Sequence, residues 1–120
     1  MSGETEWRGR GKVRARRCAD GAIEVAIDGI TTQSKYYKPL VYEFFRREAW
    51  LRPAFGDFHV SIVMEHVGEA PRMDLDNLAK ALCDALCGFA YVDDSQIARL
   101  LVERRQGERE RIVVRAERVG

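Results

Sequence analysis

Long apolar runs are missing from this sequence of 120 residues. No stretch approaches the roughly 20 apolar residues of a membrane-spanning helix, and the N-terminus has no hydrophobic signal region. We therefore expect a soluble, cytoplasmic protein. Cysteine is scarce: Cys18, Cys83 and Cys87 form no CxxC pair. Two thiolates four residues apart make a poor zinc site without further ligands, so we expect the cysteines to be reduced and to pack as small hydrophobic residues.

Several catalytic signatures are also absent. The chain has no Gly-rich phosphate loop, no GxSxG and no HExxH. The acidic stretch at Asp74 fails the calcium-loop pattern, because Leu78 occupies a position that needs an oxygen ligand. A DxD glycosyltransferase is a poor interpretation, because such enzymes need a nucleotide-sugar domain far larger than this chain. With 46% apolar residues, the chain has enough for the core of one domain without disulfides.

The net charge of +1 hides an uneven distribution. Between Trp7 and Ala19 the sequence has six basic residues and no acidic ones. Five of them fall on alternate positions, so an extended chain would present them on one side. This pattern predicts an arm that lies along phosphates or an edge strand, and a disordered tail is the alternative. We therefore treat residues 1–19 as a basic N-terminal extension and residues 20–120 as the folded domain.

The hydrophobic pattern predicts four strands and two helices. Strands are expected at residues 22–27, 58–67, 97–105 and 111–118, the last two joined by a turn that contains Gly107. One helix is expected to have Pro39 in its first turn and to end at Pro53, and a second is expected to run from Asp76 or Asn77 to about residue 87, closed by Gly88. The order βαβαββ predicts a small α/β (α+β) protein in which two main helices accompany a mixed sheet.

Acidic residues gather around the second predicted helix. Asp74 and Asp76 are separated by one residue, so in an extended segment both carboxylates would point the same way. Lys80 lies one helical turn beyond Asp76. After the helix, a short apolar segment leads to Asp93 and Asp94 and could fold back to bring them beside the helix. Spacing alone leaves that open.

Clustered carboxylates repel one another, and a bound magnesium ion relieves the repulsion. Such an ion polarises a scissile phosphate and stabilises the departing oxygen, and the Lys80 ammonium could add charge to the transition state. Each part also has an ordinary interpretation. A DxD near a helix start commonly caps the helix, an Asp-Asp pair is commonly a solvated turn, and Lys80 with Asp84 commonly forms an exposed helix pair.

The run DLDNLAKALCDALCGFAYVDDSQI, from Asp74 to Ile97, resembles the signature of the RusA family of Holliday junction resolvases. The resemblance implies a homodimeric α/β nuclease that needs Mg²⁺ (or Mn²⁺) and resolves four-way DNA junctions by paired symmetrical nicks, in recombination and repair. By motif position, Asp74, Asp76 and Asp94 would be catalytic and hold the metal, with Lys80 as the catalytic basic residue; Asp93 is a weaker candidate. The stretch 30–35 departs from the family, because it lacks the proline and asparagine of a loop that many members have.

We expect DNA to be held mainly through its phosphates. The basic residues predicted to bind it are Arg14, Arg16, Arg17, Lys35, Lys38, Arg46, Arg47 and Arg72. Tyr36, Tyr37 or Phe89 could stack at the branch point, although Phe89 also suits the core. Two other functions stay open: a structure-selective nuclease for flaps or forks, and a non-catalytic protein that binds branched DNA.

Overall fold

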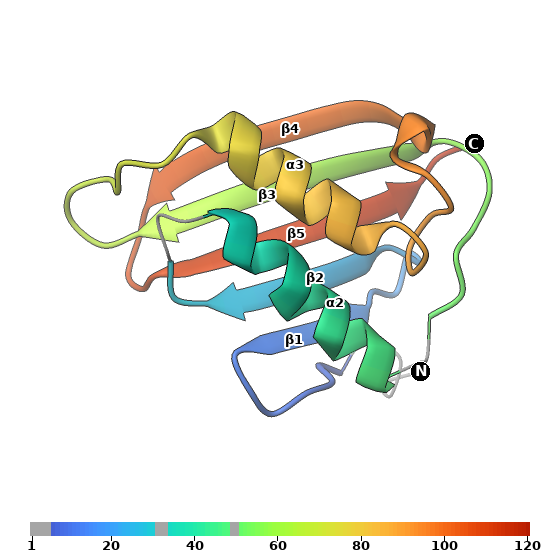
Figure 1. Ribbon diagram of the computed structural model, residues 1–120, viewed down its shortest axis with the longest axis horizontal. Helices are drawn as coiled ribbons and strands as arrows, with labels where there is room; N and C mark the ends of the chain where they lie inside the picture. Colours follow the sequence, from blue (N-terminus) through green and yellow to red (C-terminus); the bar gives the residue numbers. More distant parts are fainter. Residues whose placement is uncertain (1–5, 31–33, 49–50) are drawn as a thin grey trace.

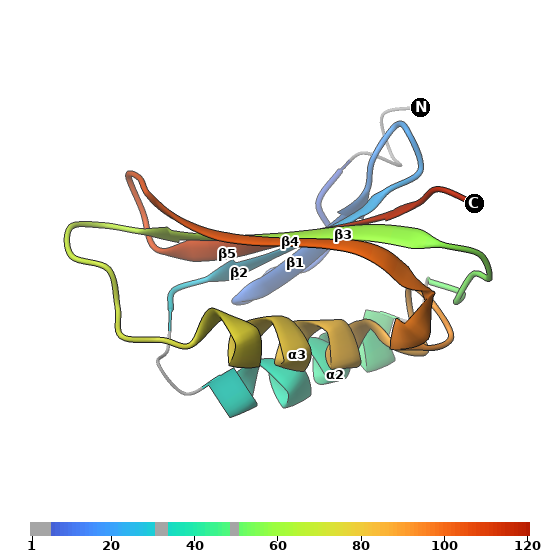
Figure 2. The ribbon, with the colours of Figure 1, turned by 90° about the horizontal axis from the view of Figure 1, so that it is seen from above.

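The computed structural model describes residues 6–30, 34–48 and 51–120. One five-stranded sheet carries two helices on the same face (Figure 1, Figure 2). In chain order the elements are β1 (Val13–Arg17), β2 (Ile23–Asp28), the 3-10 turn η1 (Ser34–Tyr36), α2 (Tyr37–Glu48), β3 (Phe58–His66), α3 (Leu75–Leu86), the 3-10 turn η2 (Asp94–Gln96), β4 (Ile97–Gln106) and β5 (Arg111–Arg118). None of the described helices is long and apolar enough to cross a membrane.

The strands lie in the order β1-β2-β5-β3-β4. β3 and β4 pair in parallel, and the other neighbouring pairs are antiparallel. The parallel pair follows from the chain path, because α3 carries the chain from the end of β3 back to the start of β4. The predicted mixed sheet with two main helices is confirmed.

The predicted order βαβαββ lacks one strand of the structure. An additional strand, β1, precedes the others, so the edge-strand alternative holds for Val13–Arg17. Val13 and Ala15 are buried and alternate with arginines, which gives the strand only two core residues. In addition, β4 and β5 are not neighbours, because β3 lies between them and pairs with both. The first helix was predicted to end at Pro53, but α2 is described as far as Glu48, and Leu51 and Arg52 just before the proline are not helical.

The core fills the space between the helices and the sheet. Alternate residues of β3 and β5 are buried, as a sheet with one covered face requires. From the helices, Val41, Phe45, Leu78 and Leu82 are almost completely buried against them. The opposite sheet face carries ion pairs, among them Arg111–Glu65 at 2.8 Å.

The aromatic residues considered for stacking at a branch point have different environments. Tyr37 is 1% exposed, and that interpretation of it is wrong. Phe89 stacks on Phe45 at a centroid distance of 5.3 Å, packed against the core. Tyr36 remains 54% exposed, with the Lys35 ammonium 5.7 Å from its ring centroid.

Candidate active site

Helix α3 begins two or three residues earlier than the sequence indicated. Asp74 is its N-cap: its Oδ1 accepts the backbone N–H of Asp76 at 3.0 Å, and its Oδ2 accepts Asn77 Nδ2 at 3.4 Å. The predicted cap at Asp76 or Asn77 is therefore wrong. Asp76 lies in the first helical turn, so the two aspartates do not lie in an extended segment. The prediction that both carboxylates point the same way along such a segment therefore does not apply.

A pocket of about 390 Å³ opens between α3 and β4. From α3 it receives Asp76, Lys80 and Cys83, which recur at helical spacing on one side. Asp94 enters from η2, and β4 contributes apolar side chains that include Leu100. The segment after α3 thus folds back, so that three of the four predicted catalytic residues share one pocket. Asp74 caps the helix and does not line the pocket.

The position of Asp94 is fixed on both sides. Three residues before it, Tyr91 is completely buried and donates its hydroxyl hydrogen to the Cys83 carbonyl at 2.7 Å. Two residues after it, Gln96 forms four hydrogen bonds. Its Oε1 accepts the N–H groups of Val92 and Asp93 at 2.8 and 3.0 Å. Its Nε2 donates to the carbonyls of Ala54 and Gly56, at 2.9 and 2.8 Å, in the segment before β3.

Asp93 has a different task from Asp94. Its carboxylate accepts the Ser95 N–H at 3.0 Å and forms a capping box with Gln96. Hydrogen bonding to Ser95 lowers the pKa of the Asp93 carboxyl. The side chain is thus committed to holding η2, while its neighbour Asp94 faces the pocket. Metal binding by Asp93 stays untested.

The pocket wall reflects the negative charge nearby. Burial, and then the charges of Asp84 and Asp94, raise the pKa of the Cys83 thiol to about 11. Burial, and then Asp94, raise the pKa of Cys87 in the same way. A group of acidic side chains that disfavours further negative charge favours a bound cation, and it would repel an unaccompanied phosphate.

Lys80 supplies the positive charge of the pocket. Within the described part of the chain Lys80 forms no ion pair, and the predicted partner Asp84 instead faces Lys38 of α2 at 4.0 Å. The Lys80 ammonium is therefore available to a ligand.

The donor set fits magnesium, although the predicted triad does not form a compact group. In residues 6–30, 34–48 and 51–120 no cluster of three or more His, Cys, Asp or Glu side chains is placed to hold a metal ion. Asp76 and Asp94 nevertheless share a solvent-open pocket. Magnesium commonly takes one or two carboxylates and completes its octahedron with water and substrate phosphate. The role of Asp74 as a ligand stays a prediction.

The comparison with protein families identifies the family to which the region around this acidic site is similar. The family model described as Endodeoxyribonuclease RusA matches residues 59–117. Over these residues the chain belongs to the RusA family. The match runs from β3 through β5 and so contains the whole α3–β4 pocket. A comparison with curated proteins finds no match.

The predicted DNA-binding residues of this RusA-family chain lie mostly outside the matched region. Several are engaged within the protein: Arg14 pairs with Asp28 at 2.8 Å, Arg16 with Glu24 at 2.6 Å and Arg46 with Glu43 at 3.1 Å, while Arg17 donates to the Gly21 carbonyl and Lys38 faces Asp84. Arg47 and Arg72 are exposed. Their contacts with DNA stay predictions.

Sequence reasoning missed two features of this chain. Gln96 was noted only as part of a motif, whereas it holds the Asp93–Asp94 turn against the segment before β3. No local signal identifies its carbonyl partners, which lie about forty positions earlier in the chain. Arg10 and Lys12 were counted in the basic run but not selected, because spacing cannot tell paired cations from unpaired ones.

Proposed function

We propose that this protein is a magnesium-dependent endonuclease that resolves four-way DNA junctions by paired, symmetrical nicks in recombination and repair. The observation that carries the proposal is that Asp76, Lys80 and Asp94 face one pocket inside the RusA-matched region. A carboxylate pair with an unpaired ammonium suits hydrolysis of a phosphodiester, because the reaction needs both a cation site and a positive group near the phosphate.

Each side chain has a definite task in this proposal. Asp76 and Asp94 would hold the metal ion, with Asp74 as a third ligand when the helix start adjusts. The bound ion, Mg²⁺ or Mn²⁺, would polarise the scissile phosphate and stabilise the departing oxygen. Lys80 would contact a phosphate oxygen and neutralise the charge that develops there. Leu100 on the pocket wall would limit the entry of water.

Paired nicks require two sites, and we propose a homodimer formed through β4. Of the two edge strands, β1 is partly covered on its outer side by the Arg8–Ala15 bridge, whereas in the described residues β4 has no partner on its outer side. The adjacent Leu100 and Leu101 are 47% and 49% exposed on opposite faces of this ten-residue strand. An unprotected edge of this kind favours pairing with another strand.

The sequence of β4 selects one antiparallel register. Pairing two copies about Leu101 places each Arg99 opposite the partner's Glu103, and each Leu100 opposite the partner's Val102. Shifting the register by two residues in one direction places Arg99 opposite the partner's Arg105. The same shift in the other direction places Arg99 opposite the partner's Leu101. Opposite charges and apolar pairs stabilise neighbouring strands, whereas like charges destabilise them. Because Leu100 and Val102 also line the catalytic pocket, the two pockets would lie close to the twofold axis.

Cleavage of end-labelled DNA tests the enzymatic proposal. A mobile four-way junction, a fork and a linear duplex are incubated with Mg²⁺ or with a chelator. We expect junction nicking that the chelator abolishes and that is lost in Asp76→Asn and Asp94→Asn, while junction binding persists or tightens because a repelling carboxylate is gone. Asp84→Asn is the matched control on the same helix, facing α2, and should keep most activity.

The alternatives give different results in this assay. Equal cutting of all three DNAs would replace junction resolution by a less selective nuclease activity. Binding without any cutting by the parent protein would indicate a non-catalytic branched-DNA-binding protein. Cutting retained by Asp94→Asn would assign its role to Asp93.

Charge exchange tests the dimer. Arg99→Glu places like charges opposite each other and should shift the protein to monomer in sedimentation equilibrium. The double variant Arg99→Glu/Glu103→Arg restores both ion pairs in a symmetric dimer and should restore the association. A monomeric parent, or equal association of all three proteins, would contradict this register.

A further inference from the structure

The N-terminal segment is a docked hairpin. Arg8 and Ala15 exchange backbone hydrogen bonds of 2.7 and 3.0 Å, so the chain folds back along the outer edge of β1. Gly9 next to this bridge has a φ of +107°. A Cβ there would lie 2.6 Å from a ring carbon of Phe44 in α2 and 2.8 Å from the Val13 carbonyl. Only glycine fits this approach, and it fixes the hairpin against the helix.

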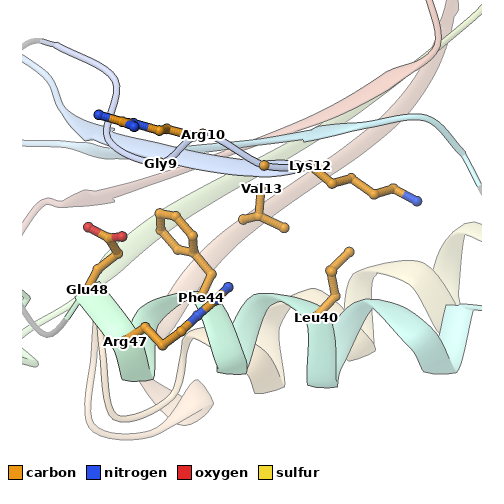
Figure 3. A pocket seen from close by; sticks show the side chains of 9 residues that line it. Gly9, Arg10, Lys12, Val13, Leu40, Phe44, Arg47 and Glu48 are labelled. Carbon is orange, nitrogen blue, oxygen red and sulfur yellow. The ribbon is translucent and has the colours of Figure 1, made fainter.

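Beneath the hairpin lies a groove of about 480 Å³, shown in Figure 3. Val13, Leu40 and Phe44 form its apolar floor, between the hairpin and α2. Its rim carries Arg10 and Lys12 from the hairpin, and Arg47 with Glu48 from the helix. Three cations therefore face a single carboxylate around the opening.

These three cations differ from their neighbours in having no internal partner. Among the residues that the structure describes, Arg10, Lys12 and Arg47 form no ion pair. Arg14 and Arg46, from the same two elements, are paired at 2.8 and 3.1 Å. Unpaired guanidinium and ammonium groups keep their full capacity to bind an external anion.

The arrangement of the charges favours a chain of phosphates over a single phosphate. In Figure 3 the Arg10 and Lys12 side chains extend in opposite directions along the hairpin, and Arg47 rises from α2 between them. The cations therefore spread along the groove and do not converge on one point. A sugar–phosphate backbone presents its charges in the same way, one per 3.4 Å of rise along each strand.

We propose that this groove binds the sugar–phosphate backbone of a DNA arm, away from the position of cleavage. The proposal rests on the proposed function for its ligand. β1 and β4 are four strand spacings apart, about 19 Å at roughly 4.8 Å each. A duplex rises that far in between five and six base steps. The groove lies beyond the RusA-matched residues, so it is an additional contact of this chain.

The experiment measures the salt dependence of DNA binding by fluorescence anisotropy. A labelled linear duplex and a labelled four-way junction are titrated without divalent metal, using protein that carries Asp76→Asn so that no cutting occurs. The groove variant is Arg10→Gln/Lys12→Gln/Arg47→Gln. With one phosphate contact per cation, the slope of log affinity against log salt on the duplex should fall in magnitude by about 2.7, at roughly 0.9 per contact.

Two further variants make the test specific. Arg14→Gln/Arg16→Gln/Arg46→Gln removes as many charges from the same elements, but they are paired ones, so the slope should fall by less than about 1. Gly9→Ala keeps every charge and displaces the hairpin, so it should reproduce at least a third of the groove variant's loss. Circular dichroism checks that each variant is folded.

Each result decides the proposal. Equal losses in the two triple variants, or a loss below about 1 in the groove variant, would overturn it. If Gly9→Ala keeps the slope of the parent, the cations bind DNA without being held in place by the docked hairpin. That result would also overturn the proposal. A parent that fails to bind DNA ends both proposals. A parent that binds but does not nick contradicts only the proposed function, since the slopes are measured without cleavage.

Discussion

Replacing Gln96 by methionine should damage both the stability and the activity of this protein. Methionine has a similar length and no group that can replace the amide, so all four hydrogen bonds of Gln96 are lost. Two of these bonds are exposed and two are partly buried. At about 0.5 kcal/mol for each exposed bond and about 1 kcal/mol for each partly buried one, the loss is about 3 kcal/mol.

Urea denaturation measures this loss. With an m-value of about 2 kcal/mol/M, the unfolding midpoint of Gln96→Met should fall by about 1.5 M. Gln96→Glu separates the two halves of the network. Its carboxylate still accepts from Val92 and Asp93, but it sets a second oxygen against the carbonyls of Ala54 and Gly56, which raises the pKa of the new carboxyl. Because that folded-state pKa exceeds the unfolded one, the destabilisation should be full at neutral pH and shrink as the pH falls towards 4.

The nicking rate reports on the second role of Gln96, as a positioning residue for Asp94. Loss of a residue that orients a ligand commonly costs 10- to 100-fold in metal affinity or activity, so Gln96→Met should need more Mg²⁺ for half-maximal nicking. Activity and stability are compared at a temperature where both proteins are fully folded. A midpoint within about 0.3 M urea of the parent, together with an unchanged magnesium requirement, would refute the reasoning.

Two other predictions concern the same region. Asp74→Asn retains a good N-cap, so its free energy of unfolding should change by less than about 0.5 kcal/mol, whereas Asp74→Ala should lose about 1 kcal/mol. If Asp74 also holds the metal, both variants should lose nicking activity. Full activity in Asp74→Asn would show that Asp74 only caps the helix. The Cys83 thiol, with its pKa raised to about 11, should react slowly with iodoacetamide at pH 8 and faster as the pH approaches 11, provided the fold persists. Rapid alkylation of folded protein at pH 8, located by mass spectrometry, would contradict its placement.

The sequence predicted most of the elements because their patterns are local. The range 111–118 was predicted with the bounds that β5 has, since the buried Ile112, Val114 and Ala116 fall on alternate positions, mostly between charged residues. Helix α3 was found through its apolar stripe, but its start was misplaced because Asp74, Asp76 and Asn77 are all good caps. Choosing among them depends on how the preceding loop approaches the helix.

What the sequence could not predict depends on contacts between distant residues. The order of the strands places β3 between β4 and β5, and no local pattern records that insertion. At the site, spacing left open whether Asp94 returns to the helix, because the hydrogen bonds of Gln96 that hold it there are made to a segment far away in the chain. The ion pair of Arg14, and the absence of an ion pair for Lys12 among the described residues, likewise follow from the arrangement of the sheet.

The central position of β5 in the sheet has a consequence for folding during synthesis. β1 and β2 reach the rest of the sheet only through β5, which also completes the antiparallel side of β3. A growing chain can form the β3–α3–β4 unit early, but the two halves cannot join until Arg118 has left the ribosome. The hairpin groove and the acidic pocket therefore come into a fixed relation only after β5 has been synthesised, so the two proposed DNA contacts should not act together before that point.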